Sequence, residues 1–266
     1  MTDPTILLFG AGNLGGAMLA GWLASGIAPT AFTVVDPYLE AAPAGVRLLR
    51  EPPPGEPFDV VMLAFKPQQL AQAAAAVEPS VGPGTLLLSI LAGPDLATLR
   101  ARFPRAAGIV RVMPNLAVAL GKAPIGLVAE ARADRALTSR LMAPLGHAEW
   151  LPGEDSMDLV TALAGSGPAF VYRFIDALAV AAANLGLPRG QADRLALAMV
   201  EGAAALAATS PHSPGKLADM VASPGGTTRK GMDVLDADGR IVTLMEDTLR
   251  AARDRSAEMT KEARNA

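Results

Sequence analysis

Short apolar runs alternate with helix-patterned segments in the first part of the chain. Strands are expected at residues 6–9, 32–35, 46–49, 59–65, 85–90, 109–113, 125–129 and 148–151. Apolar residues recur at three- and four-residue spacing in the helices expected at about 14–23, 68–77, 95–102 and 132–143. This alternation predicts an α/β fold with a parallel sheet covered by helices on both faces.

The pattern changes at Pro152-Gly153, beyond which no strand pattern appears. Helices are expected there at about 154–164, 169–185, 189–208, 216–222, 229–236 and 240–262, with an interruption at 165–168. We therefore place a boundary between an α/β domain at 1–152 and an all-helical domain at 153–266.

The first strand leads directly into the glycine motif Gly10-Ala11-Gly12-Asn13-Leu14-Gly15, which has the spacing G-x-G-x-x-G. Between a strand and a helix, such glycines permit a tight turn, close approach of a pyrophosphate, and close helix–strand packing. The helix start adds unpaired N–H groups and its positive dipole end. Asp36, about 20 residues further on at a strand end, suits a ribose 2′-hydroxyl. A structural turn explains many glycine matches, but the full context favours a Rossmann-like dinucleotide-binding domain.

Two helices of the second domain are apolar nearly all round. Residues 169–185 have Arg173, Asp176 and Asn184 as their strongly polar positions, and residues 189–208 carry few charges. Such helices must be buried, and a small domain struggles to bury two of them alone. We expect a subunit interface to cover them; the alternative is that abundant alanine exaggerates their apolar character.

Composition narrows the function classes further. The chain has no cysteine, which excludes disulfides and thiolate chemistry, and its two histidines are far apart, so no metal site is expected. The net charge of −3 and the lack of a basic run point away from nucleic acid and anionic membranes. With an acid in the start Met1-Thr2-Asp3-Pro4 and no apolar run of ~18 residues, we expect a cytoplasmic protein without a membrane span.

A second glycine-containing loop, Ser223-Pro224-Gly225-Gly226-Thr227-Thr228, precedes a predicted helix. Its backbone amides and the helix start could hold a carboxylate, whereas a plain helix–helix turn with a Thr N-cap is the simpler explanation. Lys66 and Asn115 follow strands, where ligands bind in open α/β sheets, but ordinary strand-end residues explain them equally well. Glu154 opens a helix, where an acid complements the dipole.

The motifs occur in the order typical of pyrroline-5-carboxylate reductases, a family that the chain resembles along almost its whole length. The matching blocks are Gly10 to Gly15, Ala64-Phe65-Lys66-Pro67-Gln68, Arg111-Val112-Met113-Pro114-Asn115, Gly165-Ser166-Gly167-Pro168-Ala169 and Ser223 to Thr228. The resemblance implies reduction of 1-pyrroline-5-carboxylate, a cyclic imino acid, to L-proline. It also implies a Rossmann domain and a helical domain that forms homodimers, often within larger rings.

The resemblance also assigns site residues. It implies that the substrate contacts are Glu154, Ser223, Gly225, Gly226, Thr227 and Thr228, and that Thr228 lies near the ring nitrogen as the catalytic contact. With the glycine motif, it assigns cofactor contacts to Gly10, Gly12, Asn13, Leu14, Gly15, Asp36, Ala64, Lys66, Pro67, Ala92 and Asn115. The chain departs from the family pattern at Leu116-Ala117, at Ala222 and at Glu51-Pro52-Pro53.

The expected chemistry is hydride transfer from a nicotinamide to the imine carbon. A protonated imine is already electrophilic, so the protein mainly holds the two reactants together. The family favours NADPH, but Asp36 argues for NADH, because a carboxylate accepts hydrogen bonds from a free 2′-hydroxyl and repels a 2′-phosphate. Alternatively, Asp36 turns away to cap its loop and leaves the phosphate to solvent and Arg50.

Three rival functions remain. A β-hydroxyacid dehydrogenase shares this two-domain plan but needs a general base, typically a lysine on the first long helix of the second domain, and residues 169–185 contain none. Another cyclic-imine reductase, acting on a related cyclic imine, is the second alternative. A dinucleotide-sensing regulator would need a partner surface, and no basic one is present.

Overall fold

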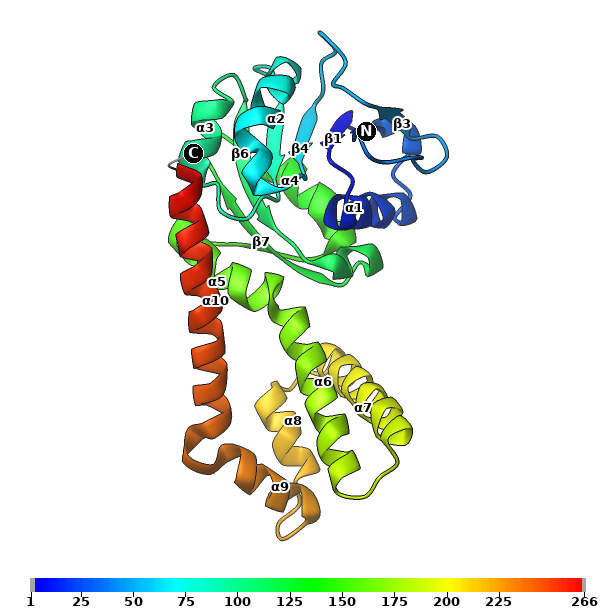
Figure 1. Cartoon of the computed structure of the whole chain (residues 1–266), viewed down its shortest axis with the longest axis vertical. Coiled ribbons are helices and arrows are strands. Elements are labelled where there is room, and N and C mark those ends of the chain that lie inside the picture. The colour runs from blue at the N-terminus through cyan, green and yellow to red at the C-terminus, as the bar shows by residue number, and fades with distance from the viewer. Residues whose placement is uncertain (1–2, 265–266) are drawn as a thin grey trace. The chain divides into compact units, whose positions relative to one another are not determined.

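The computed structural model describes residues 3–264. Met1 and Thr2, which belong to the start considered for the cytoplasmic prediction, and the last two residues of the predicted helical domain lie outside it. The chain divides into two compact units (Figure 1). The first comprises the residues up to Ser166 and those from Ala251 onward, and the second is Gly167–Arg250. The division therefore falls after the Pro152-Gly153 change in pattern, and the last helix, α10 (Arg240–Arg264), contributes to both units.

Within residues 3–264 the first unit contains one eight-stranded sheet of order β3-β2-β1-β4-β5-β6-β7-β8. The strands are β1 (Ile6–Phe9), β2 (Phe32–Val35), β3 (Arg47–Leu49), β4 (Val60–Leu63), β5 (Leu86–Ser89), β6 (Gly108–Met113), β7 (Ala123–Ala129) and β8 (Gly146–Trp150). Every predicted strand is present, with ends shifted by a few residues. The Rossmann-like α/β prediction is thus confirmed.

The prediction of an all-parallel sheet is wrong for its last two strands. β7 runs antiparallel to β6, and β8 runs parallel to β7. The link from β6 to β7, residues 114–122, contains one 3₁₀ turn, Leu116–Leu120, and a parallel crossover needs a dozen or more residues. The short link therefore forces the chain to reverse.

Helices cover both faces of the sheet, because successive strand residues point to opposite sides. On one face, Trp22 of α1 (Asn13–Ala24) is buried in the same core as Ile6 and Leu8, and its Nε1 donates to the carbonyl oxygen of Leu141 at 2.7 Å. Leu7 lies in the opposite core, with side chains from α2 (Leu70–Val77) and α3 (Leu96–Arg102). Helix α4 (Arg135–Met142) belongs to the first face.

The segment beyond the sheet is helical, as predicted. Its helices are α5 (Met157–Val160), a π turn (Thr161–Gly165), α6 (Gly167–Asn184), α7 (Arg189–Thr209), α8 (Pro214–Val221), α9 (Thr227–Asp236) and α10. The interruption expected at 165–168 is the end of the π turn and the start of α6. No helix in the described part of the chain is long and apolar enough to cross a membrane.

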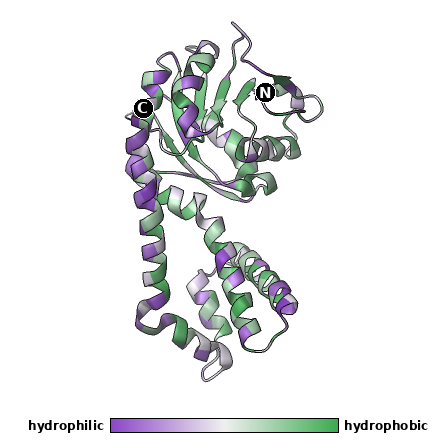
Figure 2. Ribbon diagram, in the orientation of Figure 1, coloured by the Kyte–Doolittle hydropathy of each residue, from purple (hydrophilic) through white to green (hydrophobic). Residues whose placement is uncertain are grey.

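Helices α6 and α7 pack on each other through small side chains and leave large ones outside. Ala179, Ala192 and Ala196 are buried where the two helices meet. Phe174 is 47% exposed and Leu195 60% exposed, and hydrophobic residues line both helices (Figure 2). The chain by itself therefore leaves an apolar surface uncovered on these helices.

Candidate functional site

The glycine motif has a backbone conformation that requires glycine at two of its three positions. Gly10 has φ +94°, and a Cβ there would lie 2.6 Å from the carbonyl oxygen of Ala64. A Cβ at Gly15 would lie 2.5 Å from the carbonyl oxygen of Gly10, whereas a Cβ at Gly12 would meet nothing within 4 Å. Only glycine fits the first and third positions, and the open space at Gly12 leaves its backbone approachable.

Helix α1 begins without a side-chain cap. Gly12 is its N-cap residue, Asn13 is exposed and Leu14 is half-buried. The first-turn N–H groups of a helix have no intrahelical partner, and the helix dipole makes this end positive. The turn and the helix start together suit a phosphate group.

Asp36 joins the end of β2 to the glycine turn. Its Oδ2 accepts a hydrogen bond from the amide of Ala11 at 2.9 Å, while Oδ1 accepts from the amides of Tyr38 at 2.8 Å and Leu39 at 3.1 Å. Nη1 of Arg50 donates to the carbonyl oxygens of Asp36 and Leu39. Asp36 thus caps its own loop with one oxygen, as the alternative interpretation expected, and faces the glycine motif with the other.

The remaining residues of the first unit that the sequence predicts to contact the cofactor follow the neighbouring strands. Ala64 comes directly after β4, and its amide donates to the carbonyl oxygen of Phe9 at 2.8 Å. Lys66 is exposed and precedes the 3₁₀ turn Pro67–Gln69 that leads into α2. Ala92 is half-buried in the loop after β5. Since β1, β4 and β5 are parallel neighbours, their carboxyl ends bring these residues to one edge of the sheet.

The side chain of Asn115 is occupied by the protein itself. Its Oδ1 accepts from the amide of Ala117 and its Nδ2 donates to the carbonyl oxygen of Ala164 in the π turn, both at 2.9 Å. Asn115 is buried and fixes the end of β6 to the helical segment that follows the sheet. These two hydrogen bonds hold the side-chain amide in one orientation.

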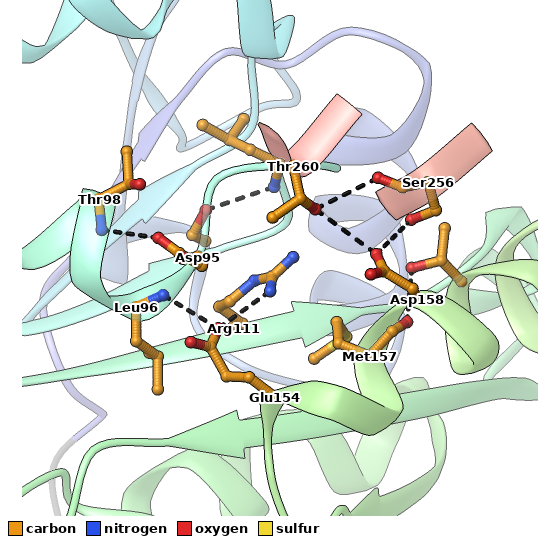
Figure 3. A network of polar contacts seen from close by, with 12 residues as sticks. Asp95, Leu96, Thr98, Arg111, Glu154, Met157, Asp158, Ser256 and Thr260 are labelled. Carbon is orange, nitrogen blue, oxygen red and sulfur yellow. Dashed lines mark hydrogen bonds and ion pairs between the residues drawn. The ribbon is translucent and has the colours of Figure 1, made fainter. Parts of the chain in front are cut away.

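Glu154 lies in a polar network inside the first unit (Figure 3). Its Oε1 accepts hydrogen bonds from Nη1 of Arg111 and from the amide of Leu96, both at 3.0 Å. The Arg111 side chain is only 5% exposed. Glu154 therefore neutralises a buried guanidinium and satisfies an amide at the start of α3. Among the described residues, its Oε2 has no hydrogen-bond partner.

The second glycine loop lies in the helical unit. Gly225 has φ +72°, and the amide of Gly226 donates to the carbonyl oxygen of Ser223 at 3.0 Å. Gly226 is the N-cap residue of α9 and provides no side-chain cap, so the expected Thr N-cap is wrong. Thr227 and Thr228 are exposed in the first turn. The loop leaves the N–H groups of this helix start without a side-chain partner.

The structure thus groups the predicted residues into two sets, each within its own unit. The sequence interpretation missed Arg111 as the partner of Glu154. It also did not single out Asp95, at the start of α3, or its partner Arg264. A charged residue inside the apolar run 109–113 was an available signal, because a buried arginine requires an acceptor. No three His, Cys, Asp or Glu side chains within residues 3–264 cluster as a metal site would require.

Comparisons with known proteins agree with one another. The family model described as "Pyrroline-5-carboxylate reductase dimerisation" matches residues 154–259. The pyrroline-5-carboxylate reductase of Pseudomonas aeruginosa is 34% identical over 98% of this chain and 99% of its own length. A solved pyrroline-5-carboxylate reductase from Coxiella burnetii has a TM-score of 0.87 and 29% identity, covering 97% of this chain and 98% of that one. The Plasmodium falciparum pyrroline carboxylate reductase, solved with NADP bound, has the same fold, with a TM-score of 0.81 at 23% identity over 98% of this chain and 99% of that one.

Proposed function

The chain belongs to the pyrroline-5-carboxylate reductase family, and we propose that it reduces 1-pyrroline-5-carboxylate to L-proline at the expense of NADH or NADPH. The observation that carries the proposal is 34% identity to a named reductase over nearly the full length of both chains. The family resemblance predicted from the motifs is thereby confirmed. The β-hydroxyacid dehydrogenase and the sensing regulator lose their support.

The residues present fit a dinucleotide. The space beside Gly12 is open, the backbone packs closely at Gly10 and Gly15, and α1 starts without a side-chain cap. These features leave room and N–H donors for a pyrophosphate. When bound, the nicotinamide supplies the hydride. We propose that Asn13, Leu14, Ala64, Lys66, Pro67, Ala92 and Asn115 complete the contacts along the carboxyl edge of the sheet.

For the substrate, we propose that the start of α9 holds the carboxylate. The amide of Gly226 closes the turn onto Ser223, but the first N–H groups of α9 have no side-chain cap, and Ser223, Thr227 and Thr228 offer short hydroxyl arms. In this proposal the Thr228 hydroxyl lies beside the ring nitrogen, where it orients the imine. Fixing the carboxylate and the ring lowers the entropic cost of bringing carbon and hydride donor together.

Glu154 has a double role in the proposal. Its Oε1 holds Arg111 and the amide of Leu96, which leaves Oε2 as the atom available to a ligand. A ligand group that carries an N–H donor is a suitable partner for such a carboxylate oxygen.

We propose that NADH serves at least as well as NADPH. Asp36 is held by three backbone amides at the end of β2, so its negative charge cannot swing away from the ribose position without breaking those hydrogen bonds. A 2′-phosphate there would meet a like charge, whereas a 2′-hydroxyl can donate to Oδ2. Arg50 is the competing influence, because its guanidinium lies at the same corner of the sheet.

We further propose that the homo-oligomer implied by the family is a dimer, alone or within a ring, formed through the helical unit. The exposed apolar side chains of α6 and α7 support it, because these helices fall within the region matched by the dimerisation model. A partner's helices would remove those side chains from water.

Steady-state assays of the purified protein test the reaction against its rivals. We expect oxidation of NADH or NADPH to depend on pyrroline-5-carboxylate, and neither NAD+ nor NADP+ to be reduced in the presence of β-hydroxy acids. A larger kcat/KM for a six-membered cyclic imine than for pyrroline-5-carboxylate would instead identify another cyclic-imine reductase. Dinucleotide binding with no turnover of any imine would favour the regulator.

A further inference from the structure

The last turns of α10 pack against the loop that follows β5. This loop, Ala92-Gly93-Pro94, contains no polar side chain, and Pro94 has no amide hydrogen. Gly93 has φ +103°, and a Cβ there would lie 3.2 Å from the carbonyl oxygen of Met259 on α10. The helix backbone therefore lies directly over a loop that has few means of fixing its own position.

An ion pair holds the end of α10 to the residue after this loop. The Asp95 side chain is 5% exposed, and its Oδ2 accepts from Nε of Arg264 at 2.7 Å and lies 2.6 Å from Nη2. Its Oδ1 accepts from the amide of Thr98 at 2.8 Å and so caps α3. One buried carboxylate thus joins the loop, the start of α3 and the C-terminal turn of α10.

A second contact holds α10 one to two turns earlier (Figure 3). The buried Ser256 donates to Oδ1 of Asp158 on α5 at 2.7 Å, and Thr260 lies 3.5 Å from the same oxygen. A cavity of about 240 Å³ lies between α10 and the start of α2, and its lining includes Pro67, Leu70, Ala92 and Met259 as well as the charged Arg255 and Glu262. Ala92 is thus incompletely packed on that side, whereas Gly93 and Pro94 are buried.

We infer that the contacts of Arg264 with Asp95 and of Ser256 with Asp158 form a C-terminal clasp that positions the Ala92–Pro94 loop for the dinucleotide. Arg264 acts as a positioning residue, because through Asp95 it holds the loop at the carboxyl end of β5. The strands next to β5 carry the other proposed cofactor residues. The inference rests on the proposed function, because it takes that edge of the sheet as the dinucleotide site. The inference predicts that the affinity for the dinucleotide depends on the last turn of α10.

The test compares Arg264→Ala with Arg253→Ala, a matched loss of an arginine on the same helix whose ion pair with Asp254 is exposed. NADH and NADPH dissociation constants are measured by titration calorimetry on the full-length protein, beside the KM for each reactant and the unfolding temperature. We expect Arg264→Ala to raise the dinucleotide Kd roughly 3- to 10-fold, with little change in the KM for the imine. Arg253→Ala should match the wild type, and Arg264→Lys should restore part of the affinity.

A double-mutant cycle protects the result against general loss of structure. Asp95→Asn keeps an N-cap acceptor for Thr98 but removes the charge, so adding Arg264→Ala to it should weaken the dinucleotide Kd little further. Unchanged Kd in folded Arg264→Ala overturns the clasp, as do additive effects in the cycle. A wild type that binds dinucleotide but does not reduce pyrroline-5-carboxylate refutes the proposed reaction and leaves the Kd comparison decisive for the clasp. A wild type that binds no dinucleotide overturns both.

Discussion

The carboxylate of Glu154 and the guanidinium of Arg111 form an ion pair with a 3.0 Å contact between the first helical turn beyond the sheet and an interior strand. The arginine is almost fully buried, while the glutamate side chain is 29% exposed. The interaction is therefore asymmetric: the charge that needs a partner lies inside, and the partner reaches it from a more accessible position.

Replacing Glu154 by Ala should destabilise the fold. The Arg111 guanidinium and the Leu96 amide would lose their acceptor, at a cost of roughly 1–3 kcal/mol in the free energy of unfolding. Glu154→Gln keeps a carbonyl acceptor and should cost less, and Asp155→Ala, at the exposed neighbouring position, is the control. Denaturant unfolding measures all three. Equal stability of Glu154→Ala and Asp155→Ala would show that the ion pair contributes nothing.

Thr228→Ala should fold normally and lower kcat/KM for pyrroline-5-carboxylate, because a polar contact to the substrate is lost. The expected loss of transition-state stabilisation is roughly 1–3 kcal/mol. Gly226→Val should be worse, since a Cβ there would lie 2.5 Å from Oγ of Ser223. Lys230→Ala, on the exposed surface of the same helix, should be neutral. Wild-type kinetics in both Thr228→Ala and Gly226→Val would remove the loop from the site.

The protein should sediment as a dimer or a larger assembly at micromolar concentration. Leu195→Glu places a charge among the exposed apolar side chains of α7 and should shift the equilibrium toward smaller species. Gln191→Glu adds the same charge at an exposed polar position of that helix and should leave the assembly unchanged. A stable, active wild-type monomer would contradict this prediction.

Cofactor choice should depend on Asp36. In the wild type we expect kcat/KM with NADH to equal or exceed that with NADPH, and Asp36→Ser should shift the ratio toward NADPH by removing the like charge. Arg50→Ala should weaken NADPH more than NADH if that guanidinium assists a 2′-phosphate. The ratio is measured in each variant. A tenfold preference of the wild type for NADPH, or an unmoved ratio in Asp36→Ser, would show that Asp36 is not the selector.

The stabilisation that the clasp contributes should depend on pH. Burial alone would raise the pKa of Asp95, but hydrogen bonds from Thr98 and the ion pair with Arg264 outweigh it and hold the pKa below its ordinary value. Its stabilisation is therefore complete above the unfolded-state pKa of about 4 and is lost as pH falls through the folded-state value. The unfolding temperature of the wild type should converge on that of Asp95→Asn below pH ~4. A constant difference from pH 7 downward would contradict this assignment.

The sequence predicted all strands because most of them are short apolar runs bounded by turns, and it predicted the glycine motif because steric demands at Gly10 and Gly15 restrict the residue type. The direction of β7 was missed, although the short segment between Met113 and Ala123 contained the reason. Strand direction depends on what a connection can span, which an apolar pattern does not encode.

The partners of polar site residues could not be predicted in the same way. Arg264 pairs with Asp95 across most of the chain, and no local pattern signals a contact of that separation. Asn115 and Glu154 were identified from motifs, whereas their hydrogen bonds to Ala164, Arg111 and Leu96 emerge only when the segment after the sheet is placed. The structural roles of these two side chains therefore could not be predicted without the fold.

The most direct measurement of the central claim is the fate of the hydride. Purified protein is incubated with pyrroline-5-carboxylate and NADH or NADPH carrying deuterium at the transferring position of the nicotinamide, and the product is analysed by mass spectrometry and NMR. The proposed reaction predicts L-proline with a single deuterium at C5 and stoichiometric oxidation of the cofactor. Absence of proline, or proline without deuterium at C5, would contradict it.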